Sequence, residues 1–113
     1  MTDLTSRKCV PCEGGIPPLP KEQIAEFMKQ LSGEWQLIEE SNIPKIKKKY
    51  KFANFKEAIS FVNKVASLAE SEGHHPNIFV YYNKVDIELY THAIKGLHDN
   101  DFIIAVKIDK LQN

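Results

Sequence analysis

The segment from residue 54 to residue 72 limits the possible folds of this chain more than any other part of the sequence. Asn54 is a good helix N-cap, and Glu57 three residues later completes a pair that resembles a capping box. Gly73 is the residue type expected just after a helix end. The apolar residues between them recur at helical spacing: Phe55, Ala58, Ile59, Val62, Val65, Ala66 and Ala69. The sequence therefore predicts a long amphipathic helix whose apolar face must pack against other elements.

Stretches on both sides of this helix show the period-two alternation of β-strands. The predicted strands are residues 34–40 and 44–52 before the helix, and residues 78–82 and 85–90 after it. Ser41-Asn42 and Asn83-Lys84 supply the turn residues. Residues 21–31 and 99–111 have the pattern of two further helices. The order α-β-β-α-β-β-α predicts an α+β fold, a four-stranded antiparallel sheet with helices packed on one face.

Lysines alternate along the second predicted strand. Ile46, Tyr50 and Phe52 share one face, with Lys48 as the exception, and the lysines at 45, 47, 49 and 51 occupy the other face. Such a stripe can contact phosphates, or it can protect an exposed sheet from pairing with other chains. We interpret it as a solvated face of the sheet.

Composition narrows the classes of protein to consider. A chain of 113 residues that is 42% hydrophobic suits one domain, expected over residues 21–113, with residues 1–20 as an N-terminal arm. Lys+Arg and Asp+Glu are both 15, which argues against direct nucleic-acid binding. No apolar run approaches the ~20 residues of a membrane span. Without a secretion signal either, the chain is expected to reside in the cytoplasm and away from membranes.

Cys9 and Cys12 form a C-x-x-C pair in the arm. Such a pair can be half of a zinc site or a redox pair, but no second cysteine pair accompanies it. Glycine and proline residues follow it closely, which is typical of an irregular segment. We interpret the arm as structural, without chemistry of its own.

The second predicted hairpin brings histidines together. A two-residue loop at Asn83-Lys84 would place Val80 opposite Ile87 and collect the apolar residues of both strands on one face. Extending that register places Pro76 opposite Thr91 and His75 opposite His92, with His74 beside them. Directly opposite residues lie roughly 5 Å apart at Cβ.

Carboxylates flank these histidines in the sequence. Glu70 precedes His74 by four residues, on the last turn of the predicted helix, and is expected to hold its imidazole. Asp101 follows His92 by nine residues and is expected to support that ring. Imidazoles and carboxylates without an obvious nucleophile suit proton transfer. A metal site and ordinary polar surface residues remain alternative interpretations.

Several spaced motifs resemble one known family. They are Glu70-x3-His74-His75-Pro76, Tyr82-Asn83-Lys84-Val85, Leu89-x-Thr91-His92, Gly96-Leu97 and Asp101, with Tyr50-x-Phe52-x2-Phe55-x2-Ala58 upstream. Over residues 20–113 the chain resembles the pterin-4a-carbinolamine dehydratases. It departs from their usual pattern at Ile78, Tyr90 and His98, where the family often has an aromatic residue, a serine and a small capping residue.

The resemblance implies an enzyme that dehydrates 4a-hydroxytetrahydrobiopterin to the quinonoid dihydropterin, without a metal or an organic cofactor. It implies a homodimer or homotetramer and a functional link to an aromatic amino acid hydroxylase, which releases the carbinolamine. Some animal members also act as dimerisation cofactors of a transcription factor. A protein-interaction module is therefore an alternative function, beside a metal-dependent enzyme and a binder of pterin without turnover.

Site residues follow from the resemblance and the predicted geometry together. The expected catalytic residues are His74 and His92 as the acid–base pair, with His75 chiefly positioning the pterin. The residues expected to bind the substrate are Glu70, His74, His75, Pro76, Thr91, His92, Ala93, Ile94 and Asp101. No metal ligands are expected.

Overall fold

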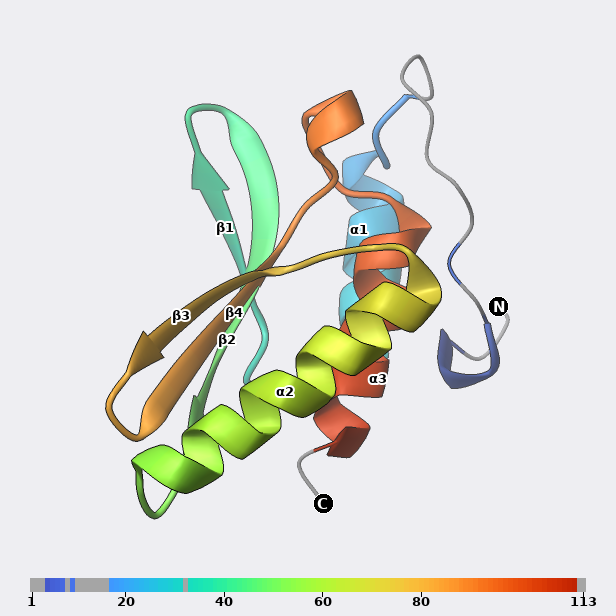
Figure 1. The fold of residues 1–113 in the computed structure, drawn as a ribbon. Coiled ribbons are helices and arrows are strands. Elements are labelled where there is room, and N and C mark those ends of the chain that lie inside the picture. The colour runs from blue at the N-terminus through green and yellow to red at the C-terminus, as the bar shows by residue number, and fades with distance from the viewer. Residues whose placement is uncertain (1–3, 8, 10–16, 32, 112–113) are drawn as a thin grey trace.

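The computed structural model describes residues 4–7, 9, 17–31 and 33–111. Its elements are η1 (Leu4–Ser6), α1 (Lys21–Met28), β1 (Gln36–Glu40), β2 (Ile43–Lys51), α2 (Phe55–Glu72), β3 (Asn77–Tyr81), β4 (Lys84–Leu89), η2 (His92–Ile94) and α3 (Asp99–Leu111). The strands form one antiparallel sheet in the order β1-β2-β4-β3. Figure 1 shows α2 and α3 side by side on one side of this sheet. The predicted α+β class, element order and four-stranded sheet are confirmed.

The central helix α2 begins and ends where its capping residues predict. The Asn54 side chain accepts a hydrogen bond from the Glu57 backbone N–H (2.9 Å), and Gly73 has the left-handed φ of 69° that ends the helix. The buried face differs from the predicted one, because Phe61 is buried while Phe55 is half exposed. Phe61 contacts the rings of Tyr50 and Phe52, with centroids 4.7 and 5.0 Å away.

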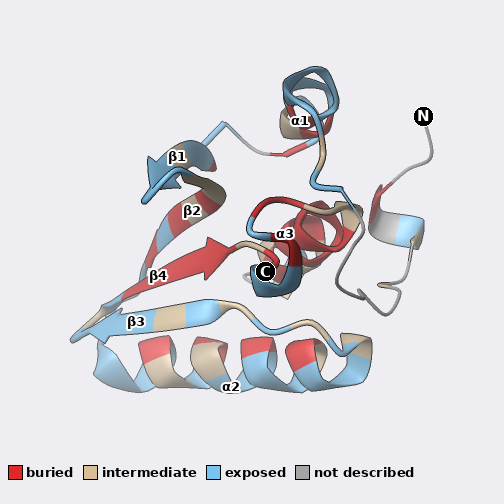
Figure 2. Ribbon diagram, turned by 90° about the horizontal axis from the view of Figure 1, so that it is seen from above, coloured by how far each residue is buried: buried red, intermediate tan, exposed pale blue. Residues whose placement is uncertain are grey.

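The sheet has one covered face and one open face. Ile46, Tyr50, Val85, Ile87 and Leu89 point to the covered face and are buried. In Figure 2, β4 is buried along most of its length, whereas the edge strand β3 is largely exposed. No helix covers the other face of β3 and β4 in the described residues, and this open face carries polar side chains of both strands, such as Asn77 and Glu88.

Lys48, the exception in the lysine stripe, lies on the covered face and is buried. Its Nζ donates to Asp109 Oδ1 (2.7 Å), as does the Tyr50 hydroxyl (2.6 Å), while Trp35 Nε1 donates to Asp109 Oδ2 (2.9 Å). Burial, and then the bond to Asp109, raises the pKa of the Tyr50 hydroxyl well above its usual range. Asp109 therefore joins the end of α3 to β2.

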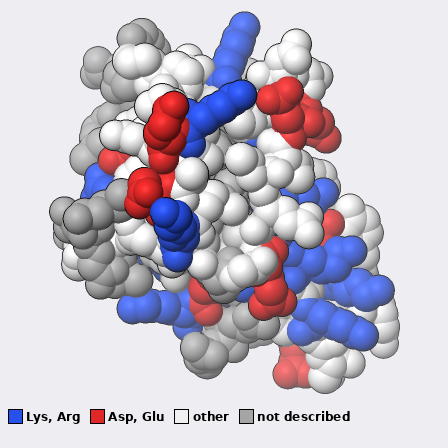
Figure 3. Space-filling view, turned by 180° about the vertical axis from the view of Figure 1, so that it is seen from behind, with Lys and Arg blue, Asp and Glu red and all other residues white. Residues whose placement is uncertain are grey.

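The predicted solvated face of the stripe needs a correction at Lys45. Lys49 and Lys51 are exposed, but the Lys45 side chain is only 11% exposed and bonds Glu40 at 2.8 Å. Figure 3 shows basic and acidic side chains interspersed over the face opposite to that of Figure 1. The lysines of β2 are thus partly matched by carboxylates of the same sheet.

The register of the second hairpin is also corrected. The two-residue loop is Tyr82-Asn83 rather than Asn83-Lys84, so that Val80 pairs with Val85 and Ile78 with Ile87. Asn83 is tied to the end of β2, because its side chain donates to the Phe52 carbonyl (3.0 Å) and its carbonyl accepts from the Phe52 N–H (2.8 Å). A shift of two residues leaves the side chains of the paired strands on their predicted faces. Tyr82, predicted on the apolar face, lies instead in the loop and is 68% exposed.

Pairing in this hairpin stops at Asn77 and Glu88. The predicted pairs of Pro76 with Thr91 and of His75 with His92 are therefore wrong, since the strand does not continue to them. The chain before Asn77 turns away toward the end of α2.

The described part of the N-terminal arm lies along the helices. Leu4 is fully buried against α3, Arg7 bonds Asp99 at 2.7 Å, and the Cys9 N–H donates to Glu72 Oε1 at 2.9 Å. Burial, and then the charge of Glu72, raises the pKa of the Cys9 thiol to about 12. Cys9 therefore stays a thiol at neutral pH, which makes it a poor nucleophile. Its predicted companion Cys12 lies outside the described residues.

Candidate active site

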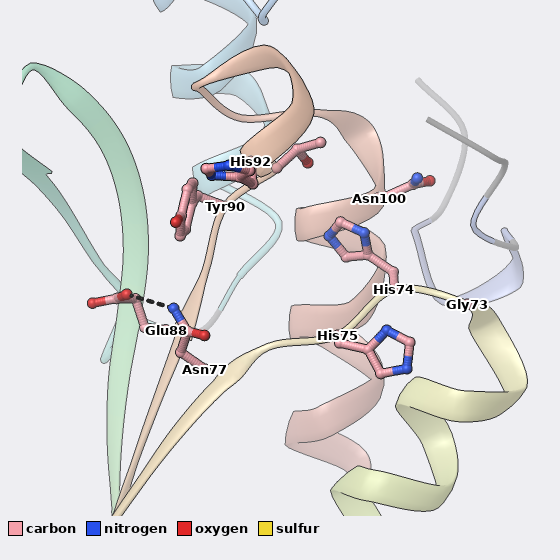
Figure 4. A pocket seen from close by; sticks show the side chains of 9 residues that line it. Gly73, His74, His75, Asn77, Glu88, Tyr90, His92 and Asn100 are labelled. Atoms are coloured by element: carbon pink, nitrogen blue, oxygen red, sulfur yellow. Dashed lines mark hydrogen bonds between the residues drawn. The ribbon is translucent and has the colours of Figure 1, made fainter. Parts of the chain in front are cut away.

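A pocket of about 320 Å³ lies where α2 ends, β3 begins and β4 leads into η2. That volume is at the small end of the range for ligand pockets. Its lining, drawn in Figure 4, consists of Gly73, His74, His75, Asn77, Glu88, Tyr90, Thr91, His92 and Asn100. The structure thus brings the three predicted histidines to one pocket, although not through the predicted strand pairing.

His74 is held by a buried carboxylate. Its Nε2 lies 2.6 Å from Asp101 Oδ1, and its side chain is 11% exposed while that of Asp101 is fully buried. Because an ionised carboxylate only accepts hydrogen bonds, Nε2 carries the proton and Nδ1 remains for other partners. Asp101 was predicted to support His92, and that prediction is wrong.

Asp101 has two further donors. Its Oδ2 accepts from the Thr91 hydroxyl (2.8 Å) and from the His98 backbone N–H (3.0 Å). One carboxylate at the start of α3 therefore fixes the end of β4, the first turn of α3 and the ring of His74. Such a fully bonded buried charge is costly to disturb.

His75 pairs with the other predicted carboxylate. Its Nε2 lies 3.1 Å from Glu70 Oε2, with the two side chains 60% and 79% exposed. Glu70 was predicted to hold His74, so this assignment is also corrected. After the left-handed Gly73, the side chain of His74 turns inward to α3 while that of His75 turns back over α2. A pair this exposed contributes little to stability.

His92 opens η2 and is exposed, with its ring edge-on to Tyr90 at a centroid distance of 6.3 Å. The loop that carries it is closed by two hydrogen bonds between Thr91 and Gly96, 2.8 and 3.4 Å long. Gly96 needs to be glycine because a Cβ there would lie 2.6 Å from Pro18. Pro18 of the arm therefore packs directly on the loop of His92.

Five residues expected to bind the substrate do not line the pocket. Asp101 lies behind His74, Ile94 is buried in the core, and Glu70 lies outside the pocket beside His75. Pro76 and Ala93 are also absent from the lining. These residues can affect a ligand in the pocket only through their backbone or through the histidines that they contact.

Sequence reasoning missed three polar residues of the pocket, Asn77, Glu88 and Asn100. Glu88 is only 5% exposed although it lies on the open face of the sheet. The available signal is an acidic residue near the end of β4, a central strand of the sheet, where carboxylates are unusual. Period-two alternation by itself predicts only a solvated polar face.

Within residues 4–7, 9, 17–31 and 33–111, no group of three or more His, Cys, Asp or Glu side chains is arranged to hold a metal ion. In the same ranges, every helix is too short or too polar to cross a membrane.

Comparisons with known proteins find similar chains and similar folds. The model of the family described as pterin 4 alpha carbinolamine dehydratase matches residues 17–111. A relative from Rickettsia canadensis is 48% identical over 96% of this chain and 97% of its own. One from Alkaliphilus metalliredigens is 43% identical over 100% of this chain and 99% of its own. Both carry the provisional name pterin-4-alpha-carbinolamine dehydratase.

Two solved structures share the fold. A transcriptional coactivator/pterin dehydratase from Brucella melitensis superposes with a TM-score of 0.76 at 30% identity, over 85% of this chain and 99% of its own. A pterin dehydratase-like protein described as a RuBisCO assembly factor has a TM-score of 0.60 at 23% identity, covering 71% of this chain and 90% of its own. The second likeness concerns the fold alone.

Proposed function

Because this chain belongs to the pterin 4 alpha carbinolamine dehydratase family, we propose that it converts 4a-hydroxytetrahydrobiopterin to the quinonoid dihydropterin and water. The observation that carries the proposal is the pocket lined by His74, His75 and His92, in which a buried carboxylate fixes one of the rings. The reaction would serve tetrahydrobiopterin recycling in the cytoplasm, downstream of an aromatic amino acid hydroxylase.

The chemistry needs one acid and one base. The bond from C4a to the hydroxyl oxygen breaks, and the departing hydroxide takes a proton from an imidazolium to become water. The proton on N5 goes to a neutral imidazole, and its electron pair forms the double bond from N5 to C4a. One histidine loses a proton and another gains one, so no redox partner or metal enters the balance.

We assign the acid–base pair to His74 and His92. Asp101 holds the His74 ring in one orientation and leaves its Nδ1 available, which suits repeated proton transfer. His92 is exposed on the opposite wall, beside Tyr90. His75, paired with Glu70, positions the pterin. Pro76, Ala93 and Ile94 contribute through the backbone of residues 74–76 and 91–94. The Thr91 hydroxyl is engaged by Asp101, so Thr91 also contributes through its backbone.

The test is the decay of a freshly made 4a-carbinolamine, followed by stopped-flow absorbance with and without the protein. We expect the protein to accelerate decay catalytically, at substoichiometric concentration, and EDTA to leave the rate unchanged because the proposed groups are side chains. Acceleration abolished by EDTA and restored by zinc would support the metal-dependent alternative. Binding of pterin without acceleration would support a ligand binder, and either result would reject the proposal.

We also propose that the chain self-associates through the edge of the sheet. Phe79, Val80, Tyr81 and Tyr82 are 40%, 38%, 53% and 68% exposed on or next to the edge strand β3. An exposed aromatic edge can pair with a second strand, which removes both edges from water. Light scattering at micromolar concentration should give about two or four times the chain mass of 12.9 kDa. A mass of one chain would contradict it.

A further inference from the structure

Glu88 is a buried carboxylate that the proposed acid–base chemistry does not use. It lies on the open face of the sheet, in the last pair of the β3–β4 ladder, opposite Asn77. Its side chain is 7% exposed, yet it lines the same pocket as the three histidines. A charged group buried at a pocket wall is held there at a cost, which marks it as a candidate for ligand recognition.

The neighbours of Glu88 engage only one of its oxygens. Asn77 Nδ2 donates to Oε1 at 3.1 Å, and Lys45 Nζ lies 3.5 Å from the same atom. Lys45 makes its shorter contact, 2.8 Å, with Glu40. No hydrogen bond to Oε2 comes from the described residues, and Oε2 is not sealed from solvent. Glu88 therefore keeps one free oxygen and a second lone pair on Oε1 for a ligand.

Glu88 also lies apart from the histidines within the pocket. Figure 4 shows Glu88 and Asn77 on one side, His74 and His75 on the other, and His92 with Tyr90 along a third. A flat ligand that contacts Glu88 at one end would therefore present its other end to the histidines.

We propose that Glu88, positioned by Asn77, binds the 2-amino and N3–H edge of the pterin ring and so selects 2-amino-4-oxo pteridines. This edge presents two N–H donors side by side, and a carboxylate presents two matching acceptors, as in the paired bonds of arginine to carboxylates. C4a lies across the pyrimidine ring from C2. Anchoring C2 at Glu88 thus directs the reacting bond away from Glu88 and toward the histidines. The inference rests on the proposed function and names the residue that determines its substrate class.

The test compares the binding of pterin with that of lumazine, in which an oxo group replaces the 2-amino group, by ligand fluorescence. Wild type should bind pterin at least about tenfold more tightly, because lumazine places an acceptor against the carboxylate. Glu88→Gln should weaken pterin binding by about 10- to 100-fold and remove the preference, since an amide can also donate to the oxo group. Glu39→Gln, an exposed carboxylate of β1 outside the pocket, is the matched control and should keep it.

The outcomes separate this inference from the proposed function. If wild type accelerates carbinolamine decay but shows no preference for pterin over lumazine, the role of Glu88 is wrong and the dehydratase stands. The same holds if Glu88→Gln keeps the wild-type preference. The wild-type preference needs no variant, so the inference remains testable even if Glu88→Gln does not fold. Asn77→Ala should reduce the preference in the same direction, by a smaller factor. If wild type neither accelerates decay nor binds pterin, both proposals fail.

Discussion

Replacing His74 or His92 by alanine is expected to lower the rate of carbinolamine dehydration by roughly 10²- to 10⁴-fold, the usual contribution of a positioned acid or base. Both rings line the pocket, and His74 is fixed by the 2.6 Å contact with Asp101. His75→Ala should cost about tenfold or less in rate and act mainly on KM, because this ring is 60% exposed and positions the substrate.

The fourth histidine provides the control for these variants. His98 lies outside the pocket lining, and its Nδ1 accepts the Asn100 backbone N–H at 3.0 Å near the start of α3. His98→Asn keeps a side chain that can cap the helix, so its rate should match wild type. Initial rates at saturating carbinolamine decide the matter. Losses below about tenfold, or ~1.4 kcal/mol, for both His74→Ala and His92→Ala would reject their assignment as the acid–base pair.

Replacing Asp101 is expected to affect both catalysis and stability. Asp101→Ala leaves the Thr91 hydroxyl and the His98 N–H without their acceptor inside the protein and frees the ring of His74. With a buried donor costing about 1–3 kcal/mol when it loses its partner, we expect a loss of about 3 kcal/mol or more in the free energy of unfolding. Urea denaturation measures this loss.

Asp101→Asn separates the two effects. The amide keeps the size of the side chain and one acceptor oxygen, so most of the stability should remain. The amide nitrogen only donates, so the amide cannot accept hydrogen bonds from His74 Nε2, the Thr91 hydroxyl and the His98 N–H as the carboxylate does. We therefore expect roughly a 10²-fold fall in kcat with little change in KM, as an orienting partner of a catalytic histidine would give.

Asp109 offers a control on the same helix. It also accepts hydrogen bonds from three side chains, Trp35, Lys48 and Tyr50, but at the end of α3 far from the pocket. Asp109→Asn should lower stability without lowering kcat. If Asp101→Asn and Asp109→Asn reduced the rate equally, or neither did, Asp101 would be a structural residue alone.

The sequence was enough to predict the fold because its patterns are local. Asn54 and Gly73 bound α2 through contacts within a few residues, and period-two alternation assigned each strand residue to a face. The hairpin register depended on a distant contact, the bonds between Asn83 and Phe52, and so was predicted two residues out of place. The error preserved the faces, which is why the core was still largely predictable.

The site was less predictable for a similar reason. The meeting of His74, His75 and His92 was predicted from a strand pairing that the structure does not contain. The three residues meet because they flank the ends of α2, β3 and β4, and their partners depend on how the chain turns after Gly73. This turn gives Asp101 to His74 and Glu70 to His75, the reverse of what sequence spacing suggests. Glu88 went unnoticed because strand alternation distinguishes only faces, and a polar face can still be buried at a pocket.

The most direct test of the account is one stopped-flow comparison at equal protein concentration. Wild type and the double variant His74→Ala/His92→Ala, matched in circular dichroism and thermal midpoint, are mixed with fresh 4a-carbinolamine. We predict catalytic decay with wild type and a rate at least about 100-fold lower with the double variant. Equal acceleration by both proteins would contradict it, because the dehydration would then not depend on the two histidines.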